Sequence, residues 1–178
     1  KPLIVQGARQ VGKTFLIKQF GQKEYPHFVP FNFDEDPKLS FLFEDKLTPE
    51  LLIEKLQIYS GEKILPESSL IFFDEIQATP QGIIALRYFY EEMPKLHVIA
   101  AGSLINFAIQ QVGMPVGRVR TLHMYPMSFL EFLAALGGIG PLLDKPQHPY
   151  SDGVHAHLLG LVGKYLAVGG MPEAINQW

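Results

Sequence analysis

Eight consecutive residues near the amino end of the sequence have the types and spacing to hold a chain of phosphates. They are Gly7, Ala8, Arg9, Gln10, Val11, Gly12, Lys13 and Thr14, which together read G-x-x-x-x-G-K-T. Glycines let a backbone curl so that its N–H groups point at phosphate oxygens. We expect the Lys13 ammonium to reach the terminal phosphates and the Thr14 hydroxyl to hold Mg²⁺.

A pair of acidic residues supplies the second half of this predicted site. Asp74 and Glu75 follow the apolar run 70–73, and Asp74 lies 61 residues (74 − 13) after Lys13. In an open α/β sheet, residues at the carboxyl ends of buried strands meet the ligand. We predict that Asp74 supports Mg²⁺ and that Glu75 is the general base that orients an attacking water.

The elements around these residues favour an α/β fold. Residues 3–5 and 69–73 are apolar on both faces, as buried parallel strands require, and a helical pattern covers 15–20. Further strands are predicted at 27–33, 96–101 and 118–124, and Pro30 favours an edge position for the first of these. Helices are predicted at 39–47, 48–60, 79–93, 104–110, 128–136 and 152–168. Thr48 is the predicted N-cap of the second, and Ser128 with Glu131 forms a capping box.

Bulk composition sets the class of protein. The chain has 178 residues, 47% apolar and 19% charged, with a net charge of −3 and no cysteine. These values indicate a globular chain without disulfides and give no support for a broadly basic DNA-binding surface. No apolar run approaches the roughly 20 residues of a membrane span. We expect no membrane partner.

We predict three parts along the chain. Residues 1–136 form the ATPase-like core, a loop rich in Gly and Pro at 137–150 links it onward, and 151–178 begin a helical lid or a following domain. Because the sequence starts without Met and stops within a predicted helix, we expect a domain cut from a longer protein.

Six phrases in one order resemble a known family. They are GARQVGKT at 7–14, FFDEIQ at 72–77, AAGS at 100–103, PVGRV at 115–119, YPMSFLEFL at 125–133 and GGMPEA at 169–174. Together they resemble prokaryotic AAA-type ATPases with a GARQVGKT loop, which usually carry an uncharacterised C-terminal domain. The resemblance implies a P-loop NTPase fold with a mostly parallel sheet of about five strands. It places the 96–101 strand between the strand that precedes the phosphate loop and the strand that ends at Asp74. It also implies ATP and Mg²⁺ as ligands and a cytoplasmic location in a prokaryote.

The same resemblance suggests roles for two polar residues, each with a structural alternative. Ser103 ends a strand expected beside the phosphate loop, so its hydroxyl is a candidate sensor of the γ-phosphate or the attacking water and a candidate N-cap for the helix that follows, and both roles can hold. Arg118 precedes the last strand, where related ATPases place an arginine finger, but an ion pair or a surface charge is an equal alternative. Arg120 ranks second for the finger. Gln77 either relays nucleotide state or caps a turn.

Two functions from different classes follow. The first is Mg²⁺-dependent ATP hydrolysis that switches or powers an attached C-terminal effector domain, in a chain that can form homo-oligomers. The second is a slowly hydrolysing, ATP-gated module that recruits a partner or DNA. A GTPase is disfavoured because the sequence has no N-K-x-D segment, and Glu75 favours water activation over transfer to a bound acceptor.

Overall fold

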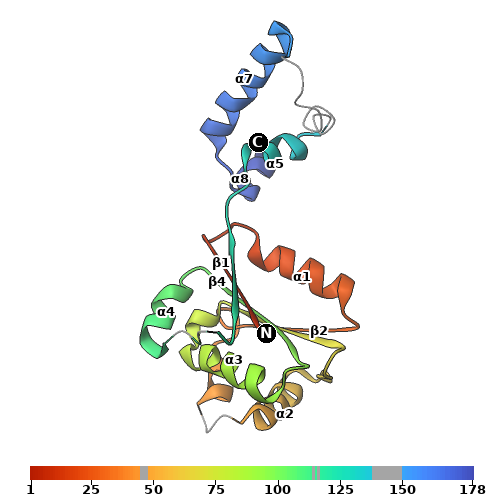
Figure 1. The fold of residues 1–178 in the computed structure, drawn as a ribbon, viewed down its shortest axis with the longest axis vertical. Coiled ribbons are helices and arrows are strands. Elements are labelled where there is room, and N and C mark those ends of the chain that lie inside the picture. The colour runs from red at the N-terminus through yellow and green to blue at the C-terminus, as the bar shows by residue number, and fades with distance from the viewer. Residues whose placement is uncertain (45–47, 114, 116, 138–149) are drawn as a thin grey trace. The chain divides into compact units, whose positions relative to one another are not determined.

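The computed structural model describes residues 1–44, 48–113, 115, 117–137 and 150–178. Within them the chain forms two compact units, Lys1–Met124 and Tyr125–Trp178, drawn from red to blue in Figure 1. Each unit is described by itself. None of the helices in the described ranges combines the length and the apolar character needed to cross a bilayer.

The first unit is built on a five-stranded sheet in the order β2-β3-β4-β1-β5. Its strands are β1 (Leu3–Gly7), β2 (His27–Asn32), β3 (Ser69–Asp74), β4 (His97–Gly102) and β5 (Arg120–Met124). Every neighbouring pair is parallel. The predicted α/β fold class is therefore confirmed, with β4 between β1 and β3 as expected.

The sheet ends on β2 at one side and on β5 at the other. Pro30 is exposed in β2. It has no N–H to donate, and an outer strand tolerates this because it pairs with only one neighbour. The first four residues of β5 are exposed and the fifth is half-buried. Only the inner strands β1, β3 and β4 are buried along most of their length.

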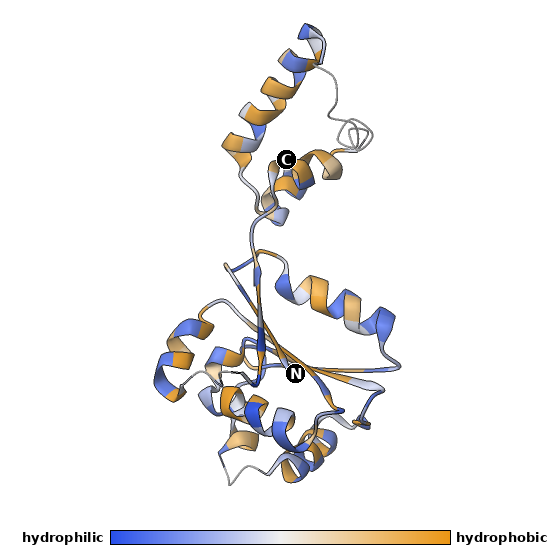
Figure 2. Ribbon diagram, viewed as in Figure 1, coloured by the Kyte–Doolittle hydropathy of each residue, from blue (hydrophilic) through white to orange (hydrophobic). Residues whose placement is uncertain are grey.

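Alternate residues of the inner strands pack on opposite faces of the sheet. One face carries Phe73, Ile71 and Ala100, in a large cluster with residues of the helices α2 (Pro49–Ser60), α3 (Pro80–Glu92) and α4 (Ile105–Val112). The other face carries Phe72 and Leu70, in a smaller cluster with Ile17 of α1 (Lys13–Glu24). Figure 1 shows α1 apart from the other three helices of this unit, across the sheet from them. In Figure 2 the middle of α1 is orange and both its ends are blue.

Several element boundaries differ from the sequence expectation. The predicted helix at 39–47 is a 3₁₀ helix, η1 (Pro37–Phe43), whose N-cap Asp36 accepts a hydrogen bond from the Lys38 N–H. The last three residues of that prediction lie outside the described residues. The last strand begins at Arg120 rather than at residue 118, because Arg118 is still in a turn in which its N–H donates to the Pro115 carbonyl.

The second unit is a small helical cluster made of α5 (Phe129–Ala135), α7 (Asp152–Val168) and α8 (Pro172–Gln177). Phe132 and Leu133 of α5 are buried against Leu161 of α7. The capping box of Ser128 and Glu131 is present at the start of α5. The structure thus groups α5 with the later helices, whereas the predicted core runs to residue 136. Nearly all of the predicted linker lies outside the described residues, so the three-part division remains a prediction.

Candidate functional site

The phosphate loop connects β1 to α1 and takes the curled form that its glycines allow. Gln10 and Gly12 both have positive φ, 63° and 97°, while Val11 between them is buried and anchors the loop. Gly7 has no room for a side chain, because a Cβ there would lie 2.2 Å from the Met124 carbonyl oxygen. Turns with residues in the left-handed region can aim successive N–H groups toward one point, and such a concave backbone binds anions.

Lys13 lies at the first turn of α1 with its side chain folded into the loop. Its Nζ donates to the carbonyl oxygens of Gly7 at 2.9 Å and Ala8 at 2.8 Å. The residue is only 5% exposed. Burial lowers the pKa of this ammonium, and the charges of Glu75 and Asp74 oppose that shift. A cation is therefore held at the centre of the loop, where phosphate oxygens would replace the carbonyls as its partners.

Thr14 and Asp74 meet across the gap between α1 and β3. The Thr14 hydroxyl donates to Oδ2 of Asp74 at 2.7 Å, although 60 residues separate them. Asp74 is 2% exposed. Burial raises the pKa of its carboxyl group, and the hydrogen bond from Thr14 opposes this rise. The sequence pattern predicted each residue separately, and the fold brings them together.

This pair fits Mg²⁺. Mg²⁺ takes oxygen ligands and is usually held by one or two carboxylates together with substrate phosphates and water, rather than by an all-protein cage. Among the described residues no group of three or more His, Asp or Glu side chains could hold a metal. One carboxylate and one hydroxyl beside a phosphate loop are what a shared, nucleotide-dependent Mg²⁺ site requires.

Glu75 leaves β3 in the left-handed region, with φ 52° and ψ 44°, a rare conformation for a residue with a side chain. Its N–H donates to Oδ1 of Asp74 at 3.1 Å. Its carboxylate accepts a hydrogen bond from the Gln77 amide, in the 3₁₀ turn η2 (Ile76–Ala78). The two acids therefore diverge: Asp74 turns to Thr14 and Glu75 to Gln77.

Ser103 follows β4, at the same edge of the sheet as the phosphate loop. The register that pairs Gln6 with Gly102 puts it level with the end of β1. It does not cap the next helix, because α4 begins at Ile105 with Leu104 at the N-cap position and no side-chain cap. The capping alternative is therefore not what the structure has, and the sensor role stays a prediction.

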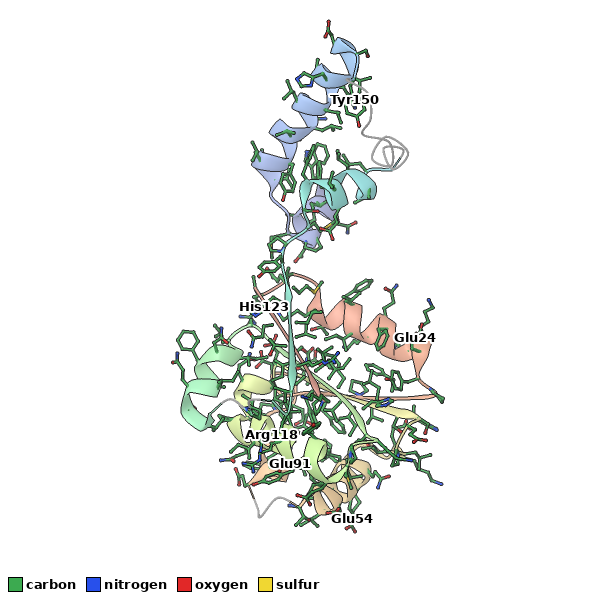
Figure 3. The ribbon with its side chains drawn as sticks, viewed as in Figure 1. Glu24, Glu54, Glu91, Arg118, His123 and Tyr150 are labelled. Carbon is green, nitrogen blue, oxygen red and sulfur yellow. The ribbon has the colours of Figure 1, made fainter. Side chains whose placement is uncertain are left out.

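Arg118 lies near the amino ends of the strands, whereas the phosphate loop lies at their carboxyl ends. The register pairs Arg120 with Leu3 at the start of β1 and Met124 with Gly7 at its end, so about 13 Å of strand separates the two ends. Arg118 Nε donates to Oε1 of Glu91 at 2.9 Å, and this bond lowers the pKa of the Glu91 carboxyl group. Figure 3 shows Arg118 beside Glu91, with His123 farther along β5.

Lys18 also contributes electrostatically to this site, although the sequence pattern did not lead us to predict it. Lys18 follows Thr14 by four residues on α1 and is one of the charges that lower the pKa of Asp74. The i, i+4 spacing puts Thr14 and Lys18 on one helix face, and this spacing was the available signal. Arg9 is exposed in the loop.

A cleft of about 320 Å³ elsewhere in the first unit does not suit a nucleotide. It is lined by Asn32, Tyr59 and three acids, Glu35, Asp36 and Glu62. Clustered carboxylates repel phosphate, whereas the loop at 7–14 offers an ammonium and converging N–H groups. The chemistry therefore favours the loop as the ligand site.

Comparison with known proteins gives one family and many solved structures. The family described as an AAA domain matches residues 1–133. Among solved structures, a chain in the structure of Drosophila ORC bound to DNA is 18% identical with a TM-score of 0.50, over 78% of this chain and 41% of that chain. The likeness supports the fold, and the chain spans less than half the length of that relative. No curated protein matches.

Proposed function

Because this chain belongs to the AAA-domain family, we propose that it binds ATP with Mg²⁺ and hydrolyses the γ-phosphate. The single observation that carries the proposal is the 2.7 Å hydrogen bond between Thr14 and Asp74. This bond joins the two predicted Mg²⁺ ligands beside the phosphate loop, which already contains the ammonium group of Lys13. A chance match to the loop pattern would give no reason for this contact between residues far apart in the sequence.

Each residue would have a distinct part in the reaction. The loop N–H groups and Lys13 would bind the phosphates, and bound Mg²⁺ would neutralise charge that develops on them. Asp74 and Thr14 would hold that ion. Glu75 would accept a proton from the attacking water, and Ser103 would contact the γ-phosphate or this water. We propose that nucleotide state then controls an effector attached beyond the described residues, in the cytoplasm of a prokaryote.

One observation favours slow hydrolysis by an isolated chain, the second candidate function. Arg118 lies at the far edge of its own sheet and pairs with Glu91. In this position it does not reach the phosphate loop of its own chain, so a contact from Arg118, worth roughly 10³–10⁵ in rate where other hydrolases use such an arginine, would be missing from that site. A slow, ATP-gated module that recruits a partner is the alternative. DNA as that partner has no support in the net charge of −3.

The test separates binding from hydrolysis. We predict that Glu75→Gln retains ATP binding and loses turnover by on the order of 10²–10⁴-fold, because the amide keeps the shape and removes the base. Asp74→Asn should instead weaken Mg²⁺-dependent binding. ATP affinity and steady-state turnover are measured on both variants. Undiminished turnover in Glu75→Gln would remove Glu75 from the reaction.

A further inference from the structure

Gln77 holds the carboxylate that the proposed function makes the general base. Its side-chain N–H donates to Oε2 of Glu75. Side chains two residues apart do not normally face one another in a helix. They meet here because the backbone of Glu75 is in the left-handed region and η2 begins directly after it. The contact is thus produced by the unusual backbone at the end of β3.

The other end of the same amide is buried without a partner. Oε1 of Gln77 has no hydrogen bond among the described residues, although buried acceptors are nearly always paired. Turning the amide over would place its oxygen against the Glu75 carboxylate, so the carboxylate fixes which end faces β4. In this orientation Oε1 of Gln77 has no hydrogen bond among the described residues, but the Gln77 N–H donates to the Glu75 carboxylate.

The end of β4 is shaped around this side chain. A Cβ added to Gly102 would lie 1.9 Å from Oε1 of Gln77, so any other residue at position 102 would push the amide away. Ser103, the predicted sensor, is the next residue in the chain. The amide of Gln77 therefore lies between the predicted base and the strand that carries the predicted sensor.

We propose that Gln77 is a positioning residue that fixes the Glu75 carboxylate and connects it to the carboxyl end of β4. This inference rests on the proposed function. Stabilising the turn is not the reason for the amide, because η2 has its own backbone bonds, from the Ala78 N–H to the Glu75 carbonyl and from the Thr79 N–H to the Ile76 carbonyl, both 3.0 Å. Gln77 touches no reacting atom and acts only through Glu75.

The first experiment replaces Gln77 by Met, which has similar length and no hydrogen-bonding group. kcat should fall on the order of 10²-fold, as expected for a misplaced catalytic group. The Kd for Mg-ATP should not change, and the melting temperature should not fall, because the unpaired buried acceptor is gone. A structural residue would show the reverse, lower stability with kcat retained.

Gln57 offers a matched control. It is also a half-buried glutamine, and its Oε1 accepts from the Ile64 N–H at 2.9 Å, a contact that involves no predicted site residue. Gln57→Met should leave kcat unchanged. An equal loss of kcat in the two variants, or an unchanged kcat in Gln77→Met, would overturn the inference.

A double-mutant cycle tests the connection to β4. Gly102→Ala should lower kcat by displacing Gln77, and it should have no further effect in the Gln77→Met background. The added methyl also meets Cγ1 of Ile105 at 2.8 Å, so an effect through Ile105 would persist in that background and would contradict the connection. A wild-type chain without turnover would overturn the proposed function and this inference together, whereas normal turnover in Gln77→Met would overturn only the inference.

Discussion

The ammonium of Lys13 already has hydrogen-bond acceptors inside the loop, where it is expected to bind phosphate. Its two carbonyl acceptors, Gly7 and Ala8, belong to the loop itself. A phosphate that enters must therefore offer better acceptors than these carbonyls, and a charged oxygen does so. Lys13 thus holds the loop together before binding and contacts the ligand afterwards.

We predict that Lys13→Ala abolishes stabilisation by Mg-ATP. A ligand at 100 times its Kd adds about 2.7 kcal/mol to stability, so the wild-type melting temperature should rise and that of the variant should not. Thermal melting with and without Mg-ATP measures this. Lys23→Ala is the control, because Lys23 is exposed on the same helix and pairs with its neighbour Glu24. Equal shifts in wild type and Lys13→Ala would contradict the assignment.

The sequence predicts residue types well and residue contacts poorly. Asp74 and Glu75 were recognised from an apolar run ending in two acids, but their divergence depends on the left-handed backbone of Glu75, which no residue type signals. The pairing of Arg118 with Glu91 spans 27 residues and depends on how α3 packs. Such contacts are set by tertiary structure, and the local sequence carries no record of them.

At the scale of elements, helix starts show which local rules the fold obeys. Thr48 caps α2 as predicted, with its hydroxyl accepting from the Leu51 N–H. Ser103 does not cap α4, because the turn after β4 continues to Leu104. Pro occupies the first position of α2, α3 and α8.

We predict that Ser128→Ala destabilises α5 and that Ser151→Ala leaves α7 unchanged. Both serines occupy N-cap positions, but only Ser128 accepts a side-chain hydrogen bond there. Loss of an N-cap costs about 1 kcal/mol, or roughly fivefold faster amide exchange in the helix. Hydrogen exchange of α5 and α7 amides measures both effects. Similar changes in the two helices would show that the cap bond is not the cause.

The capping box also makes α5 sensitive to acid. Hydrogen bonds from the Ser128 N–H, and then from its hydroxyl, lower the pKa of Glu131 below its ordinary value of 4.5. A carboxyl with a lowered folded-state pKa stabilises the fold above its unfolded pKa, and the stabilisation is lost as pH falls through the folded pKa. An NMR titration should place the Glu131 pKa below 4.5, and Ser128→Ala should raise it. A titration at the ordinary value would exclude the box in solution.

At the scale of the whole molecule, the position of Arg118 bears on assembly. It lies at the end of the strands away from its own phosphate loop, so any contact that it makes with a phosphate must be in a neighbour's site. We predict that Arg118→Ala lowers turnover far more than ATP affinity, and that mixing it with Lys13→Ala restores hydrolysis. In such mixtures, one chain supplies the arginine and the other supplies the ATP site. Steady-state turnover of the mixture, with mixed oligomers shown to form, is the measurement.

Arg87→Ala is the control for this prediction. Arg87 also pairs with Glu91, at 3.1 Å, so its removal perturbs the same carboxylate without touching Arg118. Turnover should survive Arg87→Ala. If both variants lose turnover equally, or if mixed oligomers stay inactive, Arg118 serves the ion pair and does not act on a neighbour.

The two outer strands of the sheet differ in their capacity to recruit another strand. β2 has a proline at its fourth residue and therefore lacks one donor along its outer edge, whereas β5 has no proline between Arg120 and Met124, so none of its outward-facing N–H groups is missing. Edges with a full row of donors are templates for aggregation or strand exchange, and charged side chains are the usual safeguard. Arg120 is such a charge. We expect that its replacement by an apolar β-branched residue would make the outer edge of β5 more prone than that of β2 to pair with a strand of another chain.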